Sequence, residues 1–486
     1  MAEGRKTIPT ARTMRATIKT NEGILPYYAT RVKRVMLTRL VEILIPNIFR
    51  FAAANRVGYI SVNSRLVANS STTAIVWMRM RVGYVSFRIA GTDGVSLEAE
   101  RWRKILLRMG HEVTFVAGEL DRVGLLVPSL HFTHPEVYRV HQLVIENNLS
   151  YKRVEREIFA LAGVIEGDLR QLFRMHKFDR LIVANVFSLP MHFPLAVALE
   201  RVITEYKIPT VARNHDFWWE RHRYLKSHCF EFFQRFFPPP GELIQQVTIN
   251  SIAQKELRRR LGIHSIVIGD CFDFESQMNR RDEFNSKWRQ DFSIRETDIV
   301  FLQATRIVER KQIELAMDLV SRLGDARVIL VLTGYAGDER GEYLEKLREY
   351  SQKAGIRTKY IGSRVNSARC IRGGKRVFTL WDCFVNCNWV TYPSAVEGFG
   401  NQFIEAVYYK KPIFVNRYPV YQADIEPLGF QTVAINRKVT ETATKKVVKW
   451  LANPKLVAKV VEKNFQIGKK YFSFEATAKK LKGLGF

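Results

Sequence analysis

The chain has 486 residues, too many for one ordinary domain, so we expect two or three domains. Its composition, 47% hydrophobic and 26% charged residues, is globular and excludes an intrinsically disordered protein. The formal net charge of +28 favours anionic partners: nucleic acid, an anionic membrane surface or phosphorylated small molecules. The charges form no block of five or six of one sign, which argues against a tail that binds nucleic acid.

Cysteine usage and the lack of a long apolar run bear on the compartment. The 5 cysteines show no disulfide framework, and Cys383 and Cys387 have no nearby histidines to complete a zinc site. We interpret the thiols as buried structural residues in a reducing, cytoplasmic compartment. The nearest approach to an apolar span, residues 35–54, is interrupted by charges and lacks the order of a signal peptide. Peripheral contact with the inner face of an anionic membrane stays open.

Residues 1–78 differ from the rest of the chain. They hold 12 Lys and Arg against 3 Asp and Glu, and their apolar pattern is weakly periodic and rich in turns. We predict a basic N-terminal extension with three interpretations: a membrane-associating segment, a stretch that precedes the native start, or a disordered segment. The second interpretation rests on Met78 and Met80, which stand directly before the first predicted strand.

From residue 81 the pattern becomes that of an α/β domain. The apolar run 81–87 predicts a strand, and the glycine-rich turn GTDG comes next at 91–94. A helix that ends at Gly110 is predicted after it, with one apolar face formed by Trp102, Ile105, Leu106 and Met109. Further strands are predicted at 111–118, 179–187 and 208–216.

A second α/β series begins near residue 298. Strands are predicted at 298–304, 326–334, 358–362, 388–394 and 412–416. Helices are predicted after the polar loop 305–311, with an apolar side at Ile313, Ala316, Val320 and Leu323, and again at 401–411. Alternation of strand and helix predicts parallel sheets covered on both faces.

The predicted fold is therefore α/β, with two doubly wound Rossmann-like domains that face each other across a cleft. The predicted ranges are 1–78 for the extension, 79–255 and 256–455 for the two domains, and 456–486 for a C-terminal helical segment that packs back toward the first domain. Ligands of such sheets bind beyond the carboxyl ends of the strands, so the polar residues directly after strands are the candidate site.

Two such clusters belong to the first domain. The turn GTDG lets a backbone approach a ligand closely, although a plain tight turn is an equal alternative. The loop RNHDFWWERHRY, residues 213–224, crowds charged and aromatic groups that suit a sugar, whose ring faces stack and whose hydroxyls need partners. The alternative for this loop is an aromatic satellite core with surface charges.

Two clusters belong to the second domain. In TRIVERK, Arg306 and Lys311 lie in a strand-to-helix loop, where two cations can hold a pyrophosphate; a solvated basic loop is the alternative. In EGFGNQFIE, residues 397–405, Glu405 is expected in the first turn of a helix, where the helix dipole favours a carboxylate without any ligand. Glu397 precedes the Gly-Phe-Gly turn and has no such structural reason, so it indicates a ligand.

These four motifs, in this order, resemble the retaining, nucleotide-sugar-dependent glycosyltransferases of family 4, which have the GT-B fold. The resemblance covers about residues 80–480. It implies that Arg306 and Lys311 bind the donor diphosphate and that Glu405 accepts hydrogen bonds from the ribose. It also implies a donor-sugar site, for which the candidates are Glu397 and the amides of Gly398, Phe399, Gly400 and Asn401.

The resemblance further implies that His215 contacts the sugar near the reaction centre and that Gly94 lets the donor phosphate or the acceptor approach. Glu397, His215, Arg306 and Lys311 are thus the predicted catalytic residues. Arg213, Asp216 and Trp218 are the predicted acceptor-binding residues. No metal or other cofactor is expected. One departure from the family pattern is Gly269-Asp270, where relatives often have Pro-Asn, and it affects the hinge and nearby acceptor contacts.

The predicted function is transfer of a hexose from a nucleoside-diphosphate sugar to an acceptor hydroxyl with retention of configuration. The acceptor stays open among a sugar, a phosphorylated metabolite and a lipid. A GT-B-like sugar-nucleotide epimerase is one alternative, and a non-catalytic basic protein that binds membranes or nucleic acid is another. Nucleic acid is the partner that the spread of charge disfavours.

Overall fold

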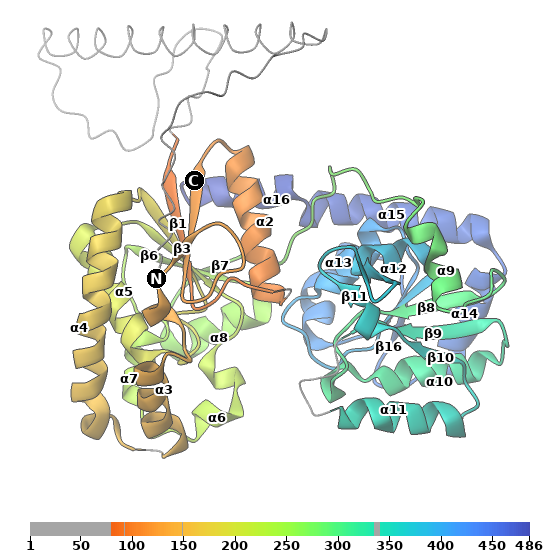
Figure 1. The fold of residues 1–486 in the computed structure, drawn as a ribbon, viewed down its shortest axis with the longest axis horizontal. Helices are drawn as coiled ribbons and strands as arrows, with labels where there is room; N and C mark the ends of the chain where they lie inside the picture. The colour runs from red at the N-terminus through yellow and green to blue at the C-terminus, as the bar shows by residue number, and fades with distance from the viewer. Residues whose placement is uncertain (1–78, 92, 148, 335–340) are drawn as a thin grey trace, which may run out of the picture. The chain divides into compact units, whose positions relative to one another are not determined.

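The computed structural model describes residues 79–486 except 92, 148 and 335–340. The predicted basic extension, residues 1–78, and the apolar stretch 35–54 within it lie outside the described residues. Two parallel sheets, each covered by helices, organise the described part (Figure 1). Both predicted Rossmann-like domains are therefore confirmed.

The first sheet has the strand order β3-β2-β1-β4-β5-β6-β7, and every neighbouring pair is parallel. The order reverses direction between β1 and β4, which is the place where ligands bind in doubly wound sheets. The strands are β1 (Arg81–Ser86), β2 (Glu112–Ala117), β3 (Leu125–Leu126), β4 (Arg180–Ala184), β5 (Thr210–Asn214), β6 (Ile244–Thr248) and β7 (Ser265–Val267).

The helices of the first domain are α2 (Gly94–Arg108), α3 (Pro135–His141), α4 (Tyr151–His176), α5 (Phe193–Tyr206), α6 (His222–Leu225), α7 (Phe230–Phe236) and α8 (Ser251–Leu261). Helix α2 starts where the Asp93 side chain accepts hydrogen bonds from the backbone N–H groups of Val95 and Ser96. The predicted apolar face of α2 is confirmed, because Trp102, Ile105 and Leu106 are buried.

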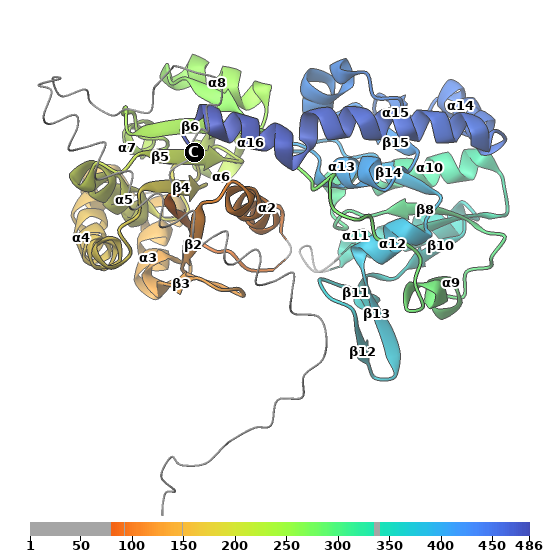
Figure 2. The same ribbon diagram turned by 90° about the horizontal axis from the view of Figure 1, so that it is seen from above.

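The second sheet has the order β10-β9-β8-β14-β15-β16 and is also parallel. Its strands are β8 (Ile299–Gln303), β9 (Val328–Leu332), β10 (Thr358–Tyr360), β14 (Trp389–Tyr392), β15 (Ile413–Asn416) and β16 (Val433–Ile435). A small sheet of β11 (Val365–Asn366), β12 (Cys370–Arg372) and β13 (Lys375–Thr379) was not predicted. Its hairpin, β12 and β13, projects from the second domain in Figure 2.

The helices of the second domain are α9 (Trp288–Asp291), α10 (Ile313–Leu323), α11 (Glu342–Lys353), α12 (Leu380–Asn386), α13 (Asn401–Tyr408), α14 (Glu441–Leu451) and α15 (Pro454–Phe472). The predicted apolar face of α10 is confirmed by burial of Ile313, Ala316 and Val320. Gly324, with φ of 60°, caps α10 in the left-handed conformation that glycine tolerates best.

The predicted boundary at residue 255 is wrong, because it falls inside α8. Strand β7 pairs with β6, so the first sheet continues to Val267 before the chain crosses to the second domain. At the other end, α15 is followed by the last helix, α16 (Phe474–Gly483), and the two run along one side of both domains (Figure 2). Phe474, Leu481 and Phe486 join the core of the first domain, so the C-terminus is part of that domain.

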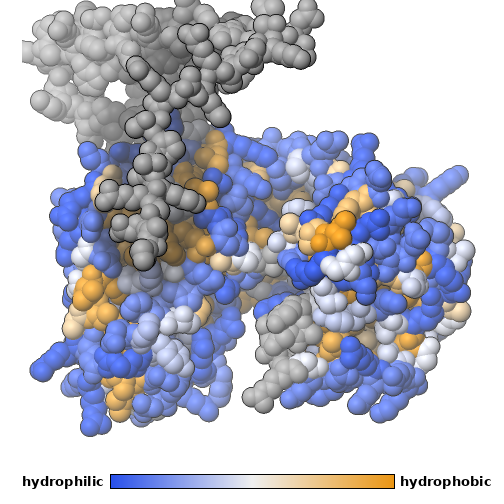
Figure 3. Space-filling view, viewed as in Figure 1, coloured by the Kyte–Doolittle hydropathy of each residue, from blue (hydrophilic) through white to orange (hydrophobic). Residues whose placement is uncertain are grey.

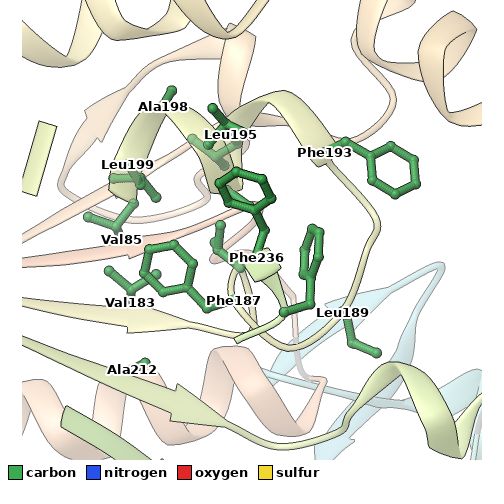
Figure 4. Close-up of a cluster of buried hydrophobic side chains, with 14 of the residues drawn as sticks. Val85, Val183, Phe187, Leu189, Phe193, Leu195, Ala198, Leu199, Ala212 and Phe236 are labelled. Atoms are coloured by element: carbon green, nitrogen blue, oxygen red, sulfur yellow. The ribbon is translucent and has the colours of Figure 1, made fainter. Parts of the chain in front are cut away.

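Buried hydrophobic side chains fill both faces of each sheet. Figure 4 shows part of one core, where Phe187, Leu195 and Phe236 pack beside strand residues Val85 and Val183. The face of the described part in Figure 3 is mostly hydrophilic with small apolar patches. Among the described helices, none is long and apolar enough to cross a membrane.

The prediction that the thiols are buried holds for four of the five cysteines. Cys229, Cys271, Cys383 and Cys387 are buried, whereas Cys370 is exposed on β12. Burial raises the pKa of the Cys383 and Cys387 thiols, which suits inert structural residues rather than metal ligands.

Candidate active site where the two domains meet

The turn between β14 and α13 holds the glycine-bracketed phenylalanine of the sequence motif. A Cβ on Gly400 would lie 2.5 Å from the Tyr418 hydroxyl, and the φ of Gly400 is 146°, so only glycine fits here. The Tyr418 hydroxyl donates to the Phe399 carbonyl oxygen at 2.7 Å. Phe399 is buried and packs edge-on against Phe472. The turn is therefore rigidly built.

Gly269, a departure from the family pattern, has a direct role in this packing. A Cβ at Gly269 would lie 2.5 Å from the Phe399 ring. A larger residue would push the ring and the turn that carries it. The glycine in the segment that crosses between the domains therefore makes room for the phenylalanine of the second-domain turn.

Glu397 lies at the start of the turn in a buried ion pair. Its carboxylate accepts a hydrogen bond from Lys311 Nζ and a second from Arg310 Nη1 at 3.3 Å. The Glu397 and Lys311 side chains are 10% and 6% exposed. Burial raises the pKa of Glu397, but the charge of Lys311 and the hydrogen bond from Lys311 hold the net pKa below its ordinary value. Glu397 is therefore an anion.

Arg306 and Lys311, predicted as one pair, sit in different surroundings. Lys311 is buried at the end of the short 3₁₀ turn Glu309–Lys311, and burial lowers its pKa although Glu397 opposes that effect. Arg306 is exposed earlier in the same loop. The structure thus brings Lys311 to Glu397 and leaves Arg306 on the solvent side.

Glu405 is not where the sequence predicted it. Helix α13 begins at Asn401, so Glu405 lies in the second turn, beyond the reach of the helix N-terminus. It is buried, and its Oε1 accepts a hydrogen bond from Arg101 Nη2 at 3.1 Å. Burial raises the pKa of Glu405 to about 7, although Arg101 opposes the shift. Its Oε2 has no hydrogen-bond partner among the described residues. An unsatisfied buried acceptor costs about 1–3 kcal/mol. A ligand that donates a hydrogen bond to Oε2 would therefore be stabilised here.

The glycine-rich turn of the first domain meets α13. Gly94 is the first residue of α2 and is exposed, and a Cβ on it would lie 3.6 Å from Asn401 Nδ2. Nearby, Asn250 Nδ2 donates to the Gly398 carbonyl oxygen at 2.8 Å. The predicted turns of the two domains, far apart in sequence, are therefore neighbours.

His215 comes directly after β5 and lies beside this junction. A Cβ on Gly398 would be 4.0 Å from the His215 carbonyl oxygen. Asn185 Oδ1 accepts from the His215 backbone N–H at 2.8 Å and lies 3.2 Å from Nδ1. Burial, followed by the charge of Arg213, holds the pKa of His215 well below its ordinary value, so the ring is neutral. With the proton on Nδ1 directed at Asn185, Nε2 is an acceptor, and it has no partner among the described residues.

Two of the three predicted acceptor residues are placed elsewhere. Arg213 is 0% exposed, pairs with Glu98 at 2.9 Å and with Asp270 at 3.6 Å, and stacks on Trp102. Trp218 is buried in the core of the first domain and donates from Nε1 to the Phe237 carbonyl oxygen. Neither side chain has a free face for an acceptor, so that part of the prediction is wrong.

The aromatic-core alternative is therefore correct for the middle of this loop. Trp218 packs against Trp219, Phe230 and Phe233. Asp216 remains partly exposed and pairs with Arg221 at 2.7 Å. Of the predicted acceptor residues, Asp216 alone keeps access to solvent.

Residues that the motifs did not include complete the junction. Arg101 joins α2 to α13, and Asn250 joins the start of α8 to Gly398. Asn185 holds His215 and has a φ of 60°, an uncommon backbone for a residue other than glycine. Asn185 comes directly after β4, and Asn250 is the residue before α8, whose N-terminus its side chain caps. A polar residue at such a position is the signal that could have identified them. In the part of the chain that the structure describes, no group of three His, Cys, Asp or Glu could hold a metal ion.

Two Rossmann-like domains whose strand-to-helix turns face each other are the architecture of the GT-B class of glycosyltransferases. Residues 284–466 match the family model described as glycosyl transferases group 1. The chain is 35% identical over 386 residues to the mannosylglucosylglycerate synthase of Petrotoga mobilis, which covers 74% of this chain and 87% of that relative. It is 32% identical over 434 residues to the enzyme of that name from Thermotoga maritima, covering 82% of this chain and 97% of that relative. The chain belongs to the group 1 glycosyltransferase family.

Solved structures agree with this fold. A glycosyltransferase from Rickettsia africae aligns with a TM-score of 0.59 at 12% identity, over 84% of this chain and 98% of that one. Anabaena HepE in complex with UDP aligns with a TM-score of 0.56 at 15% identity, over 83% and 99% of the two chains. These structures confirm the GT-B fold, and the sequence relatives and the family model confirm the glycosyltransferase resemblance.

Proposed function

We propose that this glycosyltransferase moves a hexose from a nucleoside-diphosphate sugar to an acceptor hydroxyl with retention of anomeric configuration. The observation that carries the proposal is the buried Glu397–Lys311 pair at the turn where α13 meets the first domain. A buried carboxylate beside a turn of backbone N–H groups and a neighbouring cation suits a ligand that has both hydroxyls and phosphates.

In this proposal the second domain holds the donor. Lys311 and Arg306 neutralise the diphosphate, and the N–H groups from Gly398 to Asn401 bind its oxygens or the sugar. Glu397 accepts hydrogen bonds from sugar hydroxyls, and the unpartnered Glu405 Oε2 accepts one from the ribose. His215 Nε2 accepts a hydrogen bond from a sugar hydroxyl on the first-domain side. No metal is needed in this scheme because the charge on the leaving phosphate is met by side chains and by the helix N-terminus.

The chemistry that we propose is front-face substitution. The bond from the anomeric carbon to the β-phosphate oxygen breaks, and a bond from that carbon to the acceptor oxygen forms on the same face. The proton of the acceptor hydroxyl passes to an oxygen of the leaving phosphate. Lys311 and Arg306 stabilise that phosphate as its charge develops.

The relatives suggest which sugar and acceptor to test. Their name describes a product that joins mannose, glucose and glycerate. Because this chain covers most of their length, we propose mannose as the transferred hexose and a glucosylglycerate-like acceptor that bears a carboxylate. The net charge of +28 suits such an anion. The synthase name also favours transfer over the epimerase and the non-catalytic alternatives.

A donor screen followed by product analysis tests the function. We expect one nucleoside-diphosphate sugar to raise the melting temperature selectively, since a ligand that binds the folded state stabilises it by mass action. Incubation with that donor and glucosylglycerate should yield a new glycoside whose one-bond C1–H1 coupling shows the same anomeric configuration as that of the donor. A product of inverted configuration would overturn retention. Isomerisation of the donor without an acceptor would favour the epimerase.

A further inference from the structure

Arg101 of the first domain contacts two residues of the second-domain motif 397–405, Asn401 and Glu405. It lies on α2, and its side chain is 12% exposed. Its Nη1 donates to Glu98 Oε1 on the same helix and to Asn401 Oδ1 on α13. Its Nη2 donates to Glu405 Oε1 at 3.1 Å, and its guanidinium carbon lies 5.0 Å from the centre of the Phe272 ring. One planar cation thus contacts α2, the crossing segment and α13.

The two contacts on α13 orient the polar ends of two side chains. Because Arg101 binds Oε1 of Glu405, the oxygen that lacks a partner among the described residues is Oε2, which is buried. Because Arg101 binds Oδ1 of Asn401, the amide NH₂ of that residue turns toward Gly94, 3.6 Å from where a Cβ would stand. An acceptor and a donor are therefore both aimed by the same guanidinium.

The chemistry of arginine suits this task and that of lysine does not. A guanidinium presents five N–H donors in a fixed planar fork, so it can hold a carboxylate and an amide at set angles. An ammonium is a compact charge on a flexible stem and cannot span both partners with that geometry. Glu98 holds the guanidinium of Arg101 in place through an ion pair on the same helix. Glu98 is itself 0% exposed and is fixed by a second ion pair with Arg213.

We propose that Arg101 is a positioning residue for the donor nucleotide: from the first domain it aligns Glu405 and Asn401 of the second. The inference rests on the proposed function, since it requires the donor to bind these two side chains. It follows that donor affinity depends on Arg101 although Arg101 belongs to the other domain. Binding of the acceptor and the chemical step depend on it much less.

The variants R101K and R101M test this role, with R108M as the matched control. Arg108 lies on the same helix and pairs with Asp273 of the crossing segment instead of with α13. The probe is GDP-mannose, titrated by calorimetry and varied in initial-rate assays against glucosylglycerate. R101K keeps the positive charge beside Glu98 and Glu405 and should therefore fold even if R101M does not, so the test can still be made.

We expect R101K and R101M to raise the donor KM and Kd on the order of tenfold or more, with R101K the milder variant. We expect kcat and the acceptor KM to change less than about threefold, and R108M to match the wild type. Donor affinity in R101K and R101M equal to that of R108M would overturn the assignment, as would a loss confined to kcat. Failure of the wild type to bind or consume GDP-mannose or any other nucleoside-diphosphate sugar would instead overturn the proposed function and this inference together.

Discussion

The first-domain loop 213–224 and the second-domain motif 397–405 both come after parallel strands, yet they differ in where their side chains lie. In the second motif, Gly398 and Asn401 contact the first domain, and Glu397, directly before Gly398, pairs with Lys311. In the first loop, Arg213 and Trp218 turn inward and serve the core. His215, directly after β5, stays near the junction, and Asp216 and the later residues 220–223 stay at the solvent.

The difference teaches which sequence signals are specific. Gly400 and Gly269 must be glycines because a Cβ at either position would collide with Tyr418 or Phe399. A glycine at such a position therefore indicates one particular backbone geometry. A high density of aromatic and charged residues gives no such indication, because a core and a sugar site both use rings with a polar handle. Substitutions can separate the two regions, according to whether they damage stability or activity.

Trp218→Ala should have the largest effect, and the effect should be on stability. Loss of a buried indole and of its bond to Phe237 should lower the free energy of unfolding by about 3–5 kcal/mol. Urea denaturation measures the change, with the 43% exposed Trp381→Ala as control, expected within about 0.5 kcal/mol of wild type. The milder Trp218→Phe should keep the acceptor KM; a large rise in that KM without loss of stability would restore Trp218 as an acceptor residue.

Glu397→Gln should reduce kcat/KM about 100-fold, because a neutral amide both weakens the grip on sugar hydroxyls and frees Lys311 from its partner. Initial rates at several donor concentrations measure the loss. Glu309, an exposed carboxylate in the loop that carries Lys311, is the control, and Glu309→Gln should leave the rate unchanged. Equal activity of both variants with the wild type would remove the second motif from the active site.

Glu405 should give the donor site opposite pH dependences of stability and affinity. Its pKa is about 7 in the folded chain against an ordinary value of 4.5, so the folded state prefers the protonated carboxyl. Its contribution to stability is therefore complete below the ordinary pKa and is lost as pH rises through the folded value. Donor affinity should rise over the same interval, because the carboxylate is the better acceptor.

The comparison of wild type with Glu405→Gln isolates this effect from Asp270 and Glu220, whose pKa values are also raised by burial. The carboxyl faces Arg101 and Glu98 from α2, and both remain in the variant. Urea denaturation and donor titration from about pH 5 to about pH 8 give the two curves. Identical pH slopes in the two proteins would contradict the raised pKa.

Metal removal should have the smallest effect. If Lys311, Arg306 and the start of α13 neutralise the donor phosphates, then EDTA followed by gel filtration should leave kcat and the donor KM within experimental error. Rates restored by added Mg²⁺ or Mn²⁺ after a fall would show that the second motif lacks part of its charge. In that case the side chains of the second domain would not be sufficient to neutralise the donor phosphates.

Much of the fold could be read from local patterns. Apolar runs at 81–87 and 298–304 became β1 and β8, and the periodic faces of α2 and α10 are buried as predicted. The small β11–β13 sheet was not predicted because β11 and β12 have only two and three residues and no buried position, and β13 has only two buried positions. The domain boundary was misplaced because β7 has only three residues, with no fully buried position.

The amino-acid sequence by itself determined the two α/β domains and the glycine turns, because strand periodicity and turn chemistry act over a few residues. Only the tertiary structure decided that Lys311 meets Glu397, that Arg101 reaches Glu405, and that Arg213 and Trp218 face inward. Arg101 and Glu405 are 304 positions apart in the chain. The Arg101–Glu405 contact depends on how the two domains pack together, and the others depend on how distant segments of one domain pack, so no local sequence pattern predicts them.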